Sequence, residues 1–95
     1  MSVRGDSTVA IAADVAWTGT DSRVVAMSLA TPGAVPRVLE ESAAVIWGRI
    51  AADGPLAHST LLGRLSEVFG VEARDIRVHV DGLISELADL RLLTV

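Results

Sequence analysis

The second half of the chain constrains the fold most, because short amphipathic segments follow one another there and are separated by glycine and proline. In residues 42–52 and again in residues 59–69, apolar side chains recur at the spacing of one helix face. Ser42 is a suitable N-cap for the first segment, and Gly54 follows its end. Gly70 stands where a helix commonly closes in the left-handed conformation. These patterns predict two short helices.

A third and longer helix is predicted from about residue 74 to residue 90. Its apolar residues form a stripe only roughly 80° wide at about 100° per residue, which indicates a face turned toward a core. The stripe consists of Ile76, Val80, Leu83, Leu87 and Leu90. Ile84 lies just outside it, on the flank that also carries Arg77 and Asp81. An apolar residue at such a margin either lines a groove or packs beneath a sheet, and the sequence leaves both alternatives open.

The first half of the chain is typical of strands. From Val9 to Trp17 apolar and small residues alternate with a period of two, and residues 24–29 repeat this pattern after a turn-forming stretch. Residues 35–39 predict a third strand, which contains Pro36. Because proline has no N–H to donate to a ladder, this strand is expected at the edge of the sheet.

Strands followed by helices indicate an α+β domain, and a hairpin beside three helices suggests a winged-helix-like fold with a three-stranded antiparallel sheet. The 95 residues are 51% hydrophobic, enough for one core, and none is cysteine, so neither disulfides nor thiolate metal sites contribute. We expect residues 1–8 to be a flexible lead-in and residues 9–95 to form the domain. The lack of a signal-peptide pattern or a membrane-length apolar span suggests a cytoplasmic protein without membrane contact.

No constellation of residues suggests catalysis. His58 is expected in the loop before the second helix and His79 on the third helix, both at the surface and without a second ligand or base at useful spacing. No glycine pattern suited to phosphate binding occurs. Trp17 and Trp47 are interpreted as core residues. The sequence therefore predicts a protein that is not an enzyme and needs no cofactor or metal.

A winged helix could bind DNA through its third helix, but the charge of this segment opposes that function. Residues 72–91 contain five acidic residues against three arginines, a local charge of −2, and the whole chain has a formal charge of −4. Both would repel a phosphate backbone. DNA binding therefore stays a secondary hypothesis, together with a module that only joins two proteins.

An ordered set of residues that begins with Leu39, continues through the Ile46-Trp47 pair and ends at Leu93 resembles the pattern of the PqqD-like family, the recognition elements that bind ribosomally made and later modified peptides. The resemblance covers about residues 12–95, and its most specific part is the Ile46-Trp47 pair and the spacing of that pair from Leu39. The whole set is Leu39, Ala43, Ala44, Ile46, Trp47, Asp53, Gly54, Leu61, Leu65, Phe69, Val71, Leu83, Leu87, Leu90 and Leu93.

The resemblance implies a domain that captures the leader segment of a precursor peptide and delivers it to a modifying enzyme or a leader peptidase, with a lasso-peptide pathway favoured. In such domains the leader adds a strand to the third strand, in a groove walled by the third helix, and an open sheet edge suits this mode of binding. The peptide-binding residues carried over by role are Val35, Pro36, Arg37, Val38 and Leu39 on the strand, and Arg77, Val80, Asp81 and Ile84 on the helix.

Pro36 leaves one question open within this hypothesis. If Pro36 faces the free edge, hydrogen bonding to a leader begins at Val38. If it faces inward, Arg37 supplies the outward pair and the sheet itself loses a bond.

Overall fold

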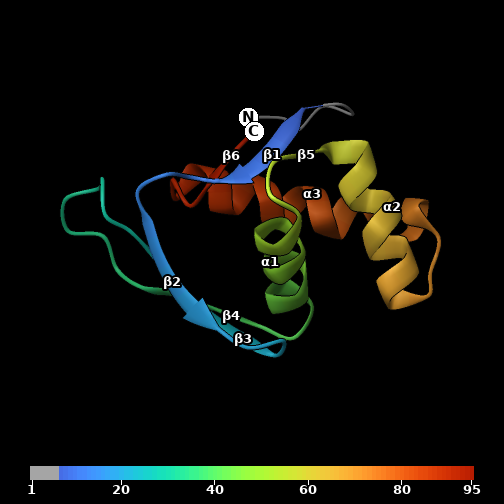
Figure 1. Cartoon of the computed structure of the whole chain (residues 1–95), viewed down its shortest axis with the longest axis horizontal. Helices are drawn as coiled ribbons and strands as arrows, with labels where there is room; N and C mark the ends of the chain where they lie inside the picture. Colours follow the sequence, from blue (N-terminus) through green and yellow to red (C-terminus); the bar gives the residue numbers. More distant parts are fainter. Residues whose placement is uncertain (1–6) are drawn as a thin grey trace.

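A computed structural model of the chain describes residues 7–95. It contains six short strands and three helices, in the order shown in Figure 1. The elements are β1 (Thr8–Ile11), β2 (Val15–Gly19), β3 (Arg23–Ser28), β4 (Arg37–Glu40), α1 (Ser42–Asp53), β5 (Leu56–Ala57), α2 (His58–Phe69), α3 (Ala73–Asp89) and β6 (Leu93–Thr94). The predicted α+β class is confirmed, with the antiparallel strands β2, β3 and β4 followed by the three helices.

The strands form two sheets instead of the single sheet that the sequence predicts. One sheet has the order β2-β3-β4, and the other has the order β5-β1-β6. In the second sheet β1 pairs with β5 through Val9 and Leu56 and with β6 through Ile11 and Leu93, all antiparallel. This small sheet joins the start of the domain to the segment before α2 and the segment after α3.

The prediction of one continuous strand from Val9 to Trp17 is wrong. The chain turns at Ala13 and Asp14, which divides this segment between the two sheets. The carbonyl of Asp14 accepts a hydrogen bond of 2.7 Å from the N–H of Leu29, so the turn is fixed to the end of β3. Residues 1–6 of the expected lead-in lie outside the described residues, and Thr8 already belongs to β1.

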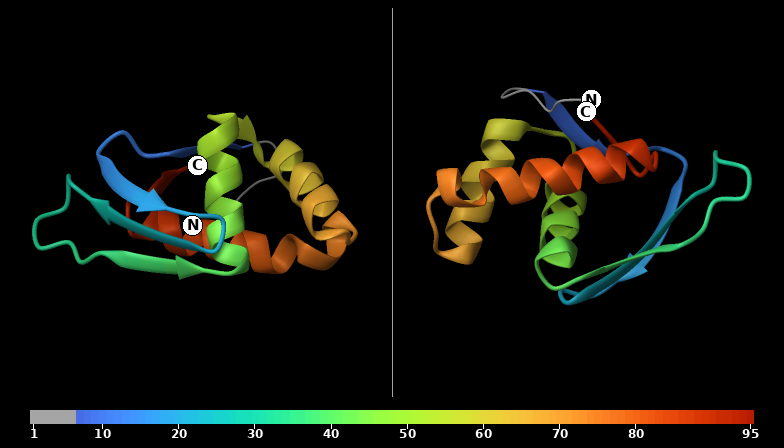
Figure 2. Two further views of the ribbon diagram at one scale, coloured as in Figure 1. Left: turned by 60° about the horizontal axis from the view of Figure 1, so that its bottom comes forward. Right: turned by 180° about the vertical axis from the view of Figure 1, so that it is seen from behind.

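The core lies between the three helices and the two sheets. In Figure 1 the β2-β3-β4 sheet lies on one side of α1, α2 lies on the other side, and α3 crosses behind both helices. The right-hand view of Figure 2 shows the molecule from behind, with α3 in front. The largest fully buried side chains come from every helix and from both sheets: Trp47, Ile46, Ile50, Leu61, Leu65, Ile84, Leu87, His58, Val9, Val24 and Val80. Burial of the apolar side chains in this set is the main source of stability for a chain without disulfides.

The helix ends agree with the sequence prediction except at the start of α1. Gly70 closes α2 at φ 67°, and its N–H donates to the carbonyl of Ser66. Ser42 is not the N-cap, because Glu41 occupies that position at φ 55° and makes no side-chain cap. The hydroxyl of Ser42 instead contacts Nε2 of His79 at 3.2 Å, which connects the start of α1 to α3.

The two tryptophans pack against each other but are not equally buried. Trp47 is fully buried as predicted, whereas Trp17 on β2 remains 43% exposed, so its assignment to the core is wrong. Their rings meet edge to face, with centroids 5.9 Å apart and planes at 74°. Trp17 therefore covers the buried Trp47 from the rim of the sheet.

Within residues 7–95, no helix is long and apolar enough to cross a membrane.

Candidate functional site

The outer edge of β4 has no strand partner among residues 7–95, where β4 pairs with β3 alone. Glu41 donates its N–H to the carbonyl of Ser22 at 3.1 Å, which identifies Ser22 and Glu41 as a hydrogen-bonded pair of this ladder. Bonded and non-bonded pairs alternate along an antiparallel ladder. Leu39 and Arg37 therefore bond to β3, while Val38 turns its N–H and C=O away from the sheet.

The hydrogen bonds on the other side of β3 agree with this alternation. Thr20 donates to the carbonyl of Arg23, and Leu29 donates to the carbonyl of Asp14, so alternate residues of β3 bond to β2. The residues between them are left to bond to β4. Within β4, Val38 is therefore the first residue whose N–H faces outward, while Pro36 lies before the strand and outside this ladder.

The side chains of β4 alternate between the two faces of the sheet. Leu39 is buried opposite Val24, and Arg37 stands on the same face opposite Ala26. Val38 points to the opposite face and is 42% exposed. Val35 and Pro36 precede the strand instead of belonging to it, and Val35 is 81% exposed. Of the five residues expected to contact a peptide here, only Leu39 is part of the core.

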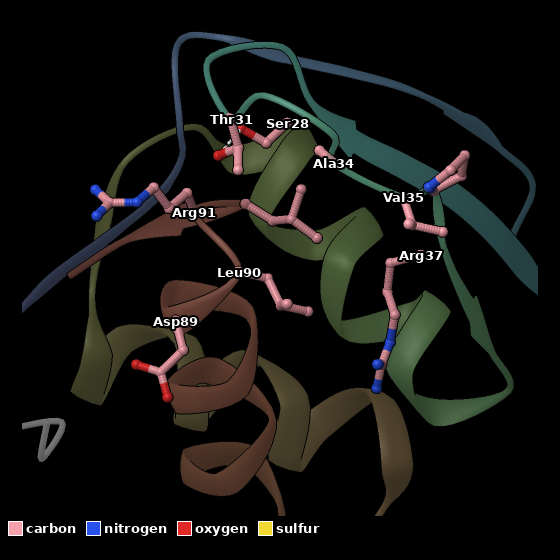
Figure 3. A pocket seen from close by; sticks show the side chains of 10 residues that line it. Ser28, Thr31, Ala34, Val35, Arg37, Asp89, Leu90 and Arg91 are labelled. Carbon is pink, nitrogen blue, oxygen red and sulfur yellow. Dashed lines mark hydrogen bonds between the residues drawn. The ribbon is translucent and has the colours of Figure 1, made fainter.

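A cavity of about 400 Å³ opens between the beginning of β4 and the C-terminal end of α3. Figure 3 shows Val35 and Arg37 on one side of it and Leu90 on the opposite side, with Arg91 farther along the α3 wall. It is lined by Ser28, Thr31, Ala34, Val35, Pro36, Arg37, Asp89, Leu90, Arg91 and Leu92. We call this space, together with the free edge of β4, the β4–α3 groove.

The wall of this groove is formed by a different flank of α3 from the one predicted. His79 contacts Ser42, Glu86 pairs with Arg37, and Leu90 lines the cavity. These helix residues lie at i, i+7 and i+11 and so share one face.

The predicted wall residues lie elsewhere on the helix. At 3.6 residues per turn, Asp81 projects roughly 140° away from Glu86. Among the described contacts, the partners of Arg77 and Asp81 are each other, at 3.8 Å, and His58 of α2. Arg77 and Asp81 therefore belong to the face that meets α2.

Val80 and Ile84 were also predicted to line the groove, and both have an exposed fraction of 0%. The prediction that Ile84 lies at the margin of the core is wrong. The buried stripe of α3 is Val80, Ile84 and Leu87, at i, i+4 and i+7, whereas Leu90 is 43% exposed. The predicted stripe shares Val80 and Leu87 with the buried one, but it included Leu90 and left out Ile84.

His58 is not the surface loop residue that the sequence suggests. It is the first residue of α2 and is 1% exposed, and its Nε2 lies 2.5 Å from Oδ1 of Asp81. Its backbone N–H also donates to the carbonyl of Ser7 at 2.8 Å. A buried imidazole needs a hydrogen-bonding partner, and Asp81 supplies it. This pair fastens α2 to α3, which gives both residues a structural role.

Several groove residues had no signal in the sequence that would have revealed them. Arg91 adopts φ 62°, a left-handed conformation that usually belongs to glycine, and so ends α3 without the expected residue type. Leu92 then donates its N–H to the carbonyl of Leu87 at 2.9 Å, which returns the chain toward β6. Ser28 and Thr31, whose hydroxyls are 3.1 Å apart, hold the β3–β4 loop at the other side of the cavity.

Within residues 7–95, no group of three or more histidine, aspartate and glutamate side chains could hold a metal ion. Comparison with protein-family models, with curated proteins and with solved structures gives no match. The inference of function therefore depends on the groove and on the residues that the sequence pattern singled out.

Proposed function

We propose that this domain binds the leader segment of a ribosomally made precursor peptide by strand addition to β4. The domain then delivers that peptide to a modifying enzyme or leader peptidase of the same pathway, with lasso-peptide maturation favoured. The observation that carries the proposal is the free edge of β4 next to an open cavity. The proposal places this binding in the cytoplasm, a compartment that suits a chain without cysteine.

The edge and the cavity supply the two parts of such an interaction. Outward N–H and C=O groups at Val38 and Glu40 can bond to an extended chain whatever its sequence, which gives affinity. The cavity between Val35 and Leu90 can take an apolar side chain of that peptide, which gives selectivity. The acidic character of α3 continues to favour a peptide over DNA as the partner.

The backbone part of the proposal can be tested with labelled peptides from the leader of the precursor encoded beside this chain. Two sets of leader peptides carry N-methyl groups on alternate residues. In one set the methyl groups block the amides that face β4, and in the other set they block the amides that face away from it. Fluorescence anisotropy should show that one set loses binding while the other retains it. Equal binding of both sets would contradict strand addition, and no binding of the unmodified leader would contradict the proposal as a whole.

The cavity can be tested with Leu90→Asp, which places a charge where an apolar side chain would dock. Because Leu90 is half exposed, the fold should tolerate this change, while leader affinity should fall about tenfold through the loss of apolar contact. Val78→Asp is the matched control, since Val78 is on the same helix and is 85% exposed. Equal affinity of the two variants would place the peptide somewhere other than this cavity.

A further inference from the structure

The cavity covers only part of the free edge of β4. Its lining includes residues 34–37 but no residue of β4 beyond Arg37. The outward backbone groups continue past that point, to Val38 and Glu40. An extended peptide that uses these groups must therefore run beyond the open cavity, toward the start of α1.

Side chains cross the β4–α3 groove at that level. The guanidinium of Arg37 pairs with the carboxylate of Glu86, so β4 is joined to α3 one helical turn before Leu90. Closer to α1, Ser42 and His79 make a second connection between the same two walls. The contact between Arg37 and Glu86 lies where the cavity ends and the remaining outward groups begin.

We propose that Arg37 and Glu86 form a latch across the β4–α3 groove, which a leader peptide must open in order to pair with Val38 and Glu40. This inference rests on the proposed function and adds a regulatory contact to the same site. The latch is weak because both side chains are about half exposed, with exposed fractions of 43% and 45%. Exposed ion pairs contribute little stability. The free energy needed to break this one therefore lowers the leader affinity of the unaltered chain by about two- to fivefold, compared with a chain that lacks the pair.

The latch predicts that two substitutions that remove opposite charges change the leader affinity in the same direction. Glu86→Gln removes a negative charge and Arg37→Gln removes a positive charge, and each should tighten leader binding by about two- to fivefold because each opens the groove. A general electrostatic effect on a charged leader would instead move the two affinities in opposite directions. The double variant should bind no more tightly than either single variant, because a latch can be opened only once.

The experiment measures leader affinity for these three variants and the unaltered chain at low and high salt. Because salt screens exposed charges, the advantage of Glu86→Gln should shrink toward onefold at about 1 M salt. Opposite effects of the two single variants, or a wild-type affinity equal to that of Glu86→Gln at low salt, would overturn the latch. If neither the unaltered chain nor any variant binds the leader, the proposed function itself fails.

A second measurement uses the chain without peptide. Thermal unfolding of the same four proteins gives the coupling between Arg37 and Glu86 as a double-mutant cycle. A favourable coupling supports the latch independently of the choice of leader. If no coupling is measured, the ion pair does not close the groove in solution, and the latch is overturned even where the leader binds.

Discussion

Replacement of Ile84 by alanine should lower the stability of this domain strongly. Ile84 has an exposed fraction of 0% and lies in the central stripe of α3, between Val80 and Leu87. Truncation of a buried isoleucine to alanine costs about 2–5 kcal/mol, because the apolar surface loses its burial and a cavity remains. For a domain of this size each kcal/mol lowers the melting temperature by about 4–8 °C, so a loss of about 3 kcal/mol corresponds to roughly 12–24 °C.

Val78 provides the control for this experiment, because it lies on the same helix and is 85% exposed. Val78→Ala should change the free energy of unfolding by less than about 0.5 kcal/mol, since surface substitutions away from special features have little effect. Both variants can be followed by circular dichroism during thermal and urea unfolding. A melting temperature for Ile84→Ala within about 4 °C of the unaltered chain would refute the assignment of Ile84 to the core.

The burial of Ile84 matters for the design of binding experiments. A change such as Ile84→Asp, which the sequence pattern suggests as a binding lesion, would bury a carboxylate without a partner and unfold the domain. Loss of leader binding in that variant would therefore carry no information about the groove. Leu90 is the residue of the same helix that can test the groove without disturbing the core.

Three further substitutions test local features of the fold by thermal unfolding. Asp81→Ala should cost about 1–3 kcal/mol, because it leaves His58 buried without its acceptor, and a loss below about 0.5 kcal/mol would show that this hydrogen bond is not formed. Gly19→Ala should cost about 1–3 kcal/mol, because its Cβ would lie 2.6 Å from the carbonyl oxygen of Arg23, and unchanged stability would contradict this close approach. Gly63→Ala should raise stability by about 0.5–1 kcal/mol, since no atom beyond the neighbouring backbone of α2 lies within 4 Å of the new methyl group, and a loss would contradict the open space.

The sequence predicted the elements better than their arrangement. Local signals determine helix ends such as Gly70, and period-two alternation identified the β2–β3 hairpin. The split of the first strand at Asp14 was missed because alternation continues through the turn, although aspartate is a turn-forming residue. The small sheet of β1, β5 and β6 was also missed, since strands of two residues leave no periodic signal.

The sequence predicted that the third strand lies at a sheet edge, but it did not predict which flank of α3 faces that edge. Pro36 indicated an edge strand, because the absence of an N–H is a local property of the residue. The flank of α3 that faces this edge depends on the position of the helix in the folded chain, which no single segment specifies. The connections of Glu86 and Asp81 to different neighbours became evident only in three dimensions.

The position of Pro36 also limits how the molecule can associate with copies of itself. A flat strand with a full row of free donors can template the stacking of identical chains, and natural proteins interrupt such rows with proline and charge. Here Pro36, which has no N–H, stands two residues before Val38, and the carboxylate of Glu40 follows two residues after it. Both residues therefore shorten the row of free groups that a second copy of the chain could pair with.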